Sequence, residues 1–153
     1  ISVWLEFRRV LFRSINITDG VISSVSGLLG RSAVSVTTTS LAVNNSATAT
    51  VTGFKGYALL SIQTSSAAWV TVYSSSAAQS SDSSRTITTD PTPGSGVIAE
   101  AITASGTTQY FSPAVIGYNN DLPVTTSVYL KITNTGAASA AITVTLTMIK
   151  LEA

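Results

Sequence analysis

Hydrophobic and polar residues alternate with a period of two along much of the chain. In residues 126–134, Val, Leu and Ile occupy one set of alternate positions, and Tyr, Lys and Thr occupy the other. Residues 141–151 repeat this pattern with threonine on the polar side. Alternation of this kind predicts half-buried β-strands. The parity changes at Ile149 and Leu151, which predicts either a β-bulge or a strand end that is buried on both sides.

The same criteria predict eight strands. They cover residues 33–43, 47–52, 57–65, 68–74, 97–104, 108–112, 126–134 and 141–151. Clusters of Gly, Asn, Asp and Pro separate these runs, and no segment has a convincing helical period. We therefore expect an all-β fold, a two-sheet antiparallel β-sandwich with a jelly-roll-like arrangement.

Serine and threonine make up 47 of the 153 residues, and only 10% of the residues are charged. This composition also occurs in disordered and mucin-like segments. Here, however, Ser and Thr are interleaved with Val, Ile, Leu and Ala, as on the open face of a strand. We expect a folded protein whose wet surface carries hydroxyl groups in place of charges.

Residues 1–14 differ from the rest because they are rich in arginine and aromatic residues. One interpretation is a basic segment that lies on a membrane or on nucleic acid. The other is more specific: LEFRRVLFRS, residues 5–14, is the translation of CTG GAG TTC AGA CGT GTG CTC TTC CGA TCT, a common sequencing adapter. We favour the second interpretation and exclude residues 1–14 as non-biological. Residues 15–35 are expected to be a connector from a missing upstream region, and residues 36–153 the sandwich domain.

Charge and composition exclude several classes of function. Residues 15–153 carry five basic and six acidic side chains, a net charge of −1, so nucleic acid is not an expected partner. No apolar run approaches the roughly 18 residues of a membrane span, so membrane insertion is not expected. The chain has no cysteine and no histidine, which removes two common metal ligands and the commonest general base. We expect no cofactor and no metal.

An enzyme would have to use carboxylates or lysine. Asp82, Asp90, Glu100 and Asp121 are the candidates for a glycosidase pair or a weak Ca²⁺ site, but they are far apart in the sequence and no calcium-binding pattern surrounds them. A serine nucleophile would have only lysine as its base, and neither S-x-x-K nor G-x-S-x-G occurs. We therefore expect no enzymatic activity and no catalytic residues.

The longest interruption between predicted strands covers residues 74–96. Arg85 lies between Asp82 and Asp90, so we expect ion pairs to tie this loop down; ligand binding and mobility are the alternatives. Glu100, in the next strand, raises a related question. If the Ile face of that strand is the core, Glu100 is buried and pairs with Arg85 or Lys131. If the Val/Ala face is the core, Glu100 lies exposed on the outer face; we favour the salt bridge.

Aromatic residues are the candidates for ligand binding. Trp69 and Tyr73 share one face of their strand, where they would either belong to the core or form an exposed platform for sugar rings. Tyr110 and Tyr118 lie near predicted loops and are the next candidates for glycan contact.

The series W-V…Y…D-S-S-R…D-P-x-P-G-S-G-V-I-A-E and the terminal L-E-A occur within residues 36–153. With these motifs at its core, this part of the chain resembles the C-terminal domain of tail-fibre-like structural proteins of marine tailed phages, in particular cyanophages. The resemblance implies a virion component located in the phage tail. It supplies no catalytic residues and no receptor-contact set.

The low content of charged residues also indicates how the chain associates with copies of itself. Strands with so few charges lack the usual protection of sheet edges, which favours a homo-oligomer in which neighbouring chains cover them. Analogy with phage fibres suggests a trimer, and a monomer whose own loops cover the edges is the alternative. A cell-surface glycan or protein would be the receptor. The competing class is a bacterial surface adhesin or a carbohydrate-binding sandwich, located extracellularly on the bacterial surface.

Overall fold

The computed structural model describes residues 15–18, 21–24 and 30–153, with side chains from residue 30 onward. The interpretation of residues 1–14 lies outside these residues. Strand β1 (Ile15–Thr18) pairs antiparallel with β2 (Val21–Ser24), within the segment expected to be a connector. Strand β3 begins at Arg31, so the sandwich starts five residues before the expected boundary at residue 36.

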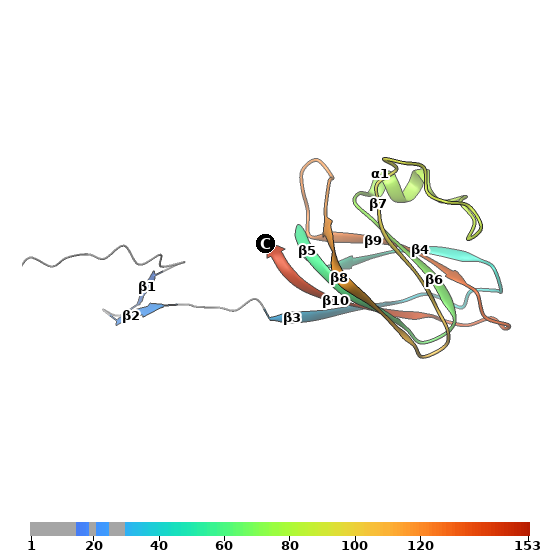
Figure 1. Ribbon diagram of the computed structural model, residues 1–153, viewed down its shortest axis with the longest axis horizontal. Coiled ribbons are helices and arrows are strands. Elements are labelled where there is room, and N and C mark those ends of the chain that lie inside the picture. The colour runs from blue at the N-terminus through green and yellow to red at the C-terminus, as the bar shows by residue number, and fades with distance from the viewer. Residues whose placement is uncertain (1–14, 19–20, 25–29) are drawn as a thin grey trace, which may run out of the picture.

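All eight predicted strands are present from β3 onward. They are β3 (Arg31–Thr37), β4 (Ser46–Thr52), β5 (Gly56–Thr64), β6 (Ala68–Tyr73), β7 (Val97–Thr103), β8 (Thr108–Tyr118), β9 (Ser127–Asn134) and β10 (Thr143–Glu152). They form two four-stranded antiparallel sheets (Figure 1), sheet I with the order β3-β10-β5-β8 and sheet II with the order β4-β9-β6-β7. The predicted two-sheet sandwich is confirmed.

The strand pairs show how the chain is wound. β3 pairs with β10, β4 with β9, β5 with β8 and β6 with β7, as the two arms of one long hairpin would. Successive pairs alternate between sheet I and sheet II, and the sheets are completed by β10–β5 and β6–β9. A long antiparallel hairpin rolled into two sheets is a jelly roll. Both sheets lie within residues 31–152, so the core that the described residues form belongs to this part of the chain.

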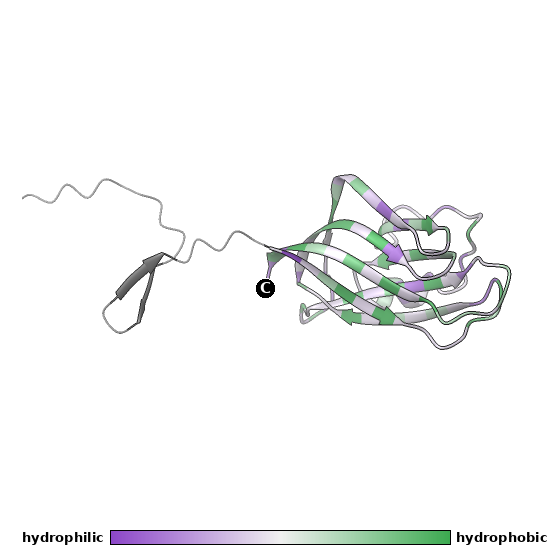
Figure 2. Ribbon diagram, turned by 90° about the horizontal axis from the view of Figure 1, so that it is seen from below, coloured by the Kyte–Doolittle hydropathy of each residue, from purple (hydrophilic) through white to green (hydrophobic). Residues whose placement is uncertain are grey.

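The core lies between the sheets and is built from the apolar half of the alternating pattern. Figure 2 shows hydrophobic and hydrophilic positions alternating along the strands. The apolar residues that are essentially inaccessible to solvent are Leu59, Ile62, Val70, Val72, Leu130, Ile132, Ile142, Val144, Leu146 and Met148. Each fully buried side chain of this size stabilises the fold by about 1.5–3 kcal/mol. Because the pattern has a period of two, hydroxyl-bearing residues take the opposite face of β10.

Three strand pairs, β10–β5, β5–β8 and β6–β7, depart from regular pairing. The β10–β5 register shifts between Lys150 and Glu152, and Leu151 there is 52% exposed. The predicted irregularity at the end of β10 is therefore a bulge, not an end buried on both sides. In β8 the register with β5 jumps from Val115 to Tyr110, and the residues between them include Pro113. Proline has no backbone N–H to donate. An edge strand tolerates it in such a bulge, because no hydrogen bond to a neighbouring strand is required there.

The segment between β6 and β7 contains one short helix, α1 (Ser76–Ser81), which the sequence pattern did not predict. Ser75 caps it by accepting a hydrogen bond from the amide of Ala78 at 3.1 Å. The helix packs on β9 and β6 (Figure 1), on the outer face of sheet II. Its one buried residue, Gln79, donates to the carbonyl oxygens of Ala49 (3.1 Å) and Leu130 (2.7 Å). We call residues 82–96, which follow α1 and lead to β7, the strap.

Candidate functional site

The strap places a polar network on the outer face of sheet II. β6 is buried along its whole length, because the core covers one face and the strap covers the other. Trp69 and Tyr73 point to the strap side and are 3% and 1% exposed. The hypothesis that these two residues form an exposed platform for sugars is therefore wrong. An alternating pattern identifies the residues that share a face, but not the loop that later covers that face.

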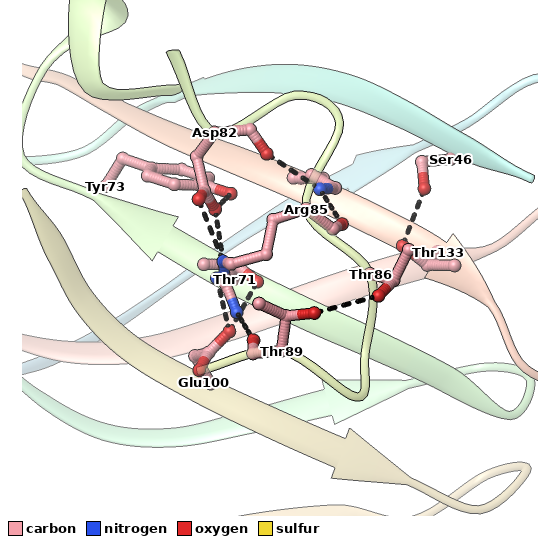
Figure 3. A network of polar contacts seen from close by, with 10 residues as sticks. Ser46, Thr71, Tyr73, Asp82, Arg85, Thr86, Thr89, Glu100 and Thr133 are labelled. Atoms are coloured by element: carbon pink, nitrogen blue, oxygen red, sulfur yellow. Dashed lines mark hydrogen bonds and ion pairs between the residues drawn. The ribbon is translucent and has the colours of Figure 1, made fainter. Parts of the chain in front are cut away.

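Arg85 is the centre of the network (Figure 3). Its Nε donates to both carboxylate oxygens of Asp82, at 2.8 and 2.9 Å, and its NH2 group donates to Glu100 at 2.6 Å. A third contact runs from NH1 to the carbonyl oxygen of Thr89 at 3.0 Å. The guanidinium carbon lies 4.9 Å from the centroid of the Trp69 ring, within the range of a cation–π interaction.

The expected ion pairs of Arg85 with Asp82 and Glu100 are both present, but Asp90 takes no part. Asp90 is exposed and forms no ion pair with any described residue. Glu100 pairs with Arg85 for a reason other than the one we preferred. The core face of β7 carries Ala99 and Ala101, while Ile102 on the other face is 63% exposed. Glu100 therefore lies on the outer face, and the strap brings Arg85 to it.

Lys131 is the second cation of the network and is 2% exposed. Its Nζ donates to the carbonyl oxygens of Asp82 (2.9 Å) and Arg85 (2.6 Å) and lies 5.1 Å from the Trp69 ring centroid. Burial lowers the pKa of the Lys131 ammonium group, because desolvation disfavours its charged form. The ammonium group thus holds the backbone of the strap onto β9.

The carboxylate of Asp82 is held ionised. Burial by itself would raise the pKa of Asp82, but hydrogen bonds from Arg85 and Tyr73 outweigh burial and lower it. The Tyr73 hydroxyl donates to Asp82 at 2.7 Å, and burial is the main cause of the raised pKa of Tyr73. Two cations and two carboxylates therefore compensate one another beneath the strap. These contacts hold the strap against sheet II.

A second polar cluster orders the loop between β8 and β9. Asp121 accepts hydrogen bonds from the Tyr129 hydroxyl at 2.6 Å and from the amide and hydroxyl of Ser76. The Tyr129 hydroxyl is the main cause of the lowered pKa of Asp121. Asn119 is buried and bonds to the backbone at Asp121, Thr125 and Ser127. This cluster joins the loop to α1 and also serves the fold.

The other two aromatic candidates are exposed. Tyr110 and Tyr118 both belong to β8 and are 73% and 54% exposed. Tyr110 borders an open groove of about 430 Å³ on the outer face of sheet I. The polar and aromatic residues that line this groove come from four strands: Arg31, Ser61, Gln63, Thr108, Tyr110, Phe111 and Thr147. The sequence identified Tyr110 as a candidate for ligand contact. It did not identify the other lining residues, because only the strand order brings them together.

A larger hollow of about 500 Å³ lies between α1 and residues 92–96. It is lined by Ser, Gly and Ala together with Asp82, Thr92 and Asn120, and no aromatic residue borders it. Within the described residues, no group of three or more acidic, His or Cys side chains is arranged to hold a metal ion. The same residues include no helix that is long and apolar enough to cross a membrane.

Comparison with known proteins does not identify a family for this chain. No protein-family model matches the chain, and no curated protein matches it.

Proposed function

We propose that this chain is a non-enzymatic structural component of a phage virion, the C-terminal domain of a tail-fibre-like protein that assembles with copies of itself and contacts the host surface. The sequence resemblance over residues 36–153 motivates this proposal. The jelly roll is compatible with it, since this architecture recurs in viral capsid and lectin domains. The polar network beneath the strap holds the strap against sheet II and therefore serves the fold.

The edge strand β4 is the observation that carries the assembly part of the proposal. β4 is regularly paired with β9 over seven residues, and it contains no charged residue, proline or bulge. The other edges differ: β8 contains Pro113 and a bulge, β7 carries the ion-paired Glu100, and β3 begins with Arg31. An unprotected edge invites pairing with another chain, and neighbouring subunits of a fibre would cover it.

The mass of residues 30–153 in solution, measured by light scattering, tests assembly. We expect a trimer. The double substitution Thr48→Lys and Thr50→Lys places two charges at exposed positions of β4. It should give a monomer, because charged side chains block edge pairing. The matched control is Thr145→Lys with Thr147→Lys on the central strand β10, which adds the same charge away from an edge and should leave the trimer intact. A wild-type monomer at all concentrations would refute the assembly part.

The location of the protein is tested separately. Antibodies against the sandwich should label the tail ends of virions purified from marine cyanobacterial cultures or from seawater. Labelling of bacterial cell surfaces without labelling of virions would favour the second candidate, a bacterial adhesin or carbohydrate-binding sandwich. The open groove beside Tyr110 is the observation that keeps this second candidate in view.

A further inference from the structure

The groove on sheet I is bordered by residues that strand register brings into line. Thr147 of β10 pairs with Ser61 of β5, and Ser61 pairs with Tyr110 of β8, so these three residues form one row across the sheet. The next row contains Gln63, paired with Thr108. Arg31 enters from β3 at the far edge. An aromatic ring at one end and a cation at the other thus border a floor of hydroxyl and amide groups.

The groove differs from the rest of this hydroxyl-rich face in how its polar groups are used. Elsewhere on sheet I the hydroxyls bond to one another: Thr145 to Ser35, and Thr143 to Thr37, both at 2.8 Å. In the groove, no hydrogen bond joins the Ser61 hydroxyl to a described residue, and among these residues Tyr57 has the one side-chain oxygen that is buried without a partner. The Ser61 hydroxyl therefore faces the water of the groove and is available to a ligand.

Tyr110 adds an aromatic surface beside these polar groups. Its side chain is 73% exposed, and its backbone position in β8 is fixed by pairing with Ser61. A tyrosine ring presents a flat apolar face and a polar tip. A sugar ring matches this arrangement, because it has an apolar face of C–H groups and a rim of hydroxyls. Peptides and lipids would instead require a larger apolar lining, and only Leu60 and Phe111 supply one here.

The charge of the lining selects among sugars. Among the described residues that line the groove, Arg31 is the one that is charged, and none of them carries a carboxylate. A guanidinium group binds a carboxylate through two parallel hydrogen bonds. Arg31 and Tyr110 belong to the opposite edge strands of sheet I, which lie about 14 Å apart at a strand spacing of about 4.8 Å. We propose that this groove is a binding site for an acidic oligosaccharide, with one sugar ring stacked on Tyr110, the carboxylate of another ring on Arg31, and sugar hydroxyls on Ser61, Gln63 and Thr147. The inference rests on the proposed host-contact role and names the chemistry of the receptor.

Calorimetry on residues 30–153 tests the site with two probes, a galacturonic acid tetrasaccharide and the corresponding galactose tetrasaccharide. The acidic probe should bind more tightly than the neutral one. Tyr110→Ala should weaken binding of the acidic probe about tenfold or more, because the stacking surface is lost. Arg31→Gln should reduce the affinity for the acidic probe to that for the neutral one. Tyr118→Ala, an exposed tyrosine of the same strand outside the groove lining, is the control and should leave both affinities unchanged.

The outcomes separate this inference from the proposed function. Failure of both probes, together with failure of a broad glycan array, would overturn the saccharide site even if the antibodies label virions. Binding that survives Tyr110→Ala would overturn the placement in this groove, and equal binding of both probes would overturn the role of Arg31. Binding with the expected variant pattern, but without virion labelling, would support the site and refute the phage location. Unchanged thermal unfolding of the variants shows that the fold is retained.

Discussion

Arg85 lies with its guanidinium carbon 4.9 Å from the ring centroid of Trp69, and the same guanidinium binds Asp82 and Glu100. One side chain of the strap thereby covers Trp69 of β6 and forms ion pairs with two carboxylates. The side chain of Arg85 is only 7% exposed. Asp82 is 9% exposed and therefore has little access to water that would replace Arg85, whereas Glu100 is 28% exposed.

The first prediction concerns the stability that Arg85 provides. Arg85→Ala should lower the free energy of unfolding by about 3–5 kcal/mol, because it leaves the buried carboxylate of Asp82 without its cation. Urea unfolding followed by tryptophan fluorescence measures this loss. Arg31→Ala is the control: Arg31 is exposed, so the change should stay within about 0.5 kcal/mol. A loss below about 1 kcal/mol for Arg85→Ala would show that the strap is not clamped by this residue.

A second prediction follows from the lowered pKa of Asp82. In the folded state this pKa lies below that of an unfolded aspartate, about 3.9, so the folded state binds fewer protons in this range. The corresponding stability is fully present above the unfolded pKa and is lost as the pH falls through the folded pKa. Wild-type stability should therefore drop steadily below about pH 4. Unfolding free energies from pH 7 to pH 2 measure the effect.

Two variants test whether Asp82 causes this dependence of stability on pH. Asp82→Asn should be less stable at pH 7 and should lose less further stability on acidification. Asp90→Asn removes an exposed carboxylate that has no ion pair among the described residues, and it should retain the wild-type pH dependence. If Asp82→Asn has the same slope as the wild type, the acid sensitivity originates elsewhere, with Asp121 as the next group to test.

The strap also marks the limit of what the sequence could predict. Alternation located all eight strands and paired Trp69 with Tyr73 on one face. It could not show that this face is covered, because the covering segment has no periodicity of its own. Helix α1 was missed because six residues are too few to produce a helical pattern, and its stability comes from the Ser75 cap and Gln79.

The site on sheet I shows the same limit in another form. Arg31, Gln63 and Tyr110 belong to β3, β5 and β8, and β10 lies between β3 and β5. These residues meet in one groove only because of the jelly-roll strand order, and that order cannot be inferred from their spacing in the sequence. Glu100 is an instructive intermediate case. Arg85 was one of its two predicted partners, but the preferred arrangement with the Ile face of β7 in the core was wrong, because Ala99 and Ala101 face the core.

A third prediction concerns the close approach of Gly117 to Tyr57. A Cβ atom at position 117 would lie 2.3 Å from the Tyr57 ring, so Gly117→Ala must displace a ring that is 1% exposed. Overpacking of this kind costs about 1–3 kcal/mol. Gly30→Ala is the control, because nothing lies within 4 Å of its added Cβ atom. Chemical unfolding of both variants measures the difference.

The contact itself is tested by a double-mutant cycle. Tyr57→Leu should remove the clash, so Gly117→Ala should cost clearly less in that background than in the wild type. Tyr57→Leu also removes the hydroxyl of Tyr57, which is buried without a hydrogen-bond partner among the described residues and whose pKa is raised by burial. Equal costs of Gly117→Ala in both backgrounds would mean that the backbone at position 117, and not the ring, causes the loss.

The last prediction concerns Gln79, which joins α1 to sheet II through the carbonyl oxygens of Ala49 and Leu130. Gln79→Ala removes both hydrogen bonds and should speed amide exchange in α1 and the strap, while exchange in the central strands β9 and β10 changes little. The global loss should be about 1–3 kcal/mol, the typical cost of unmade buried hydrogen bonds. Ser80→Ala, an exposed residue of the same helix, controls for helix propensity. Uniformly faster exchange across both sheets would show that α1 and the strap unfold only together with the sandwich, not as a separate unit.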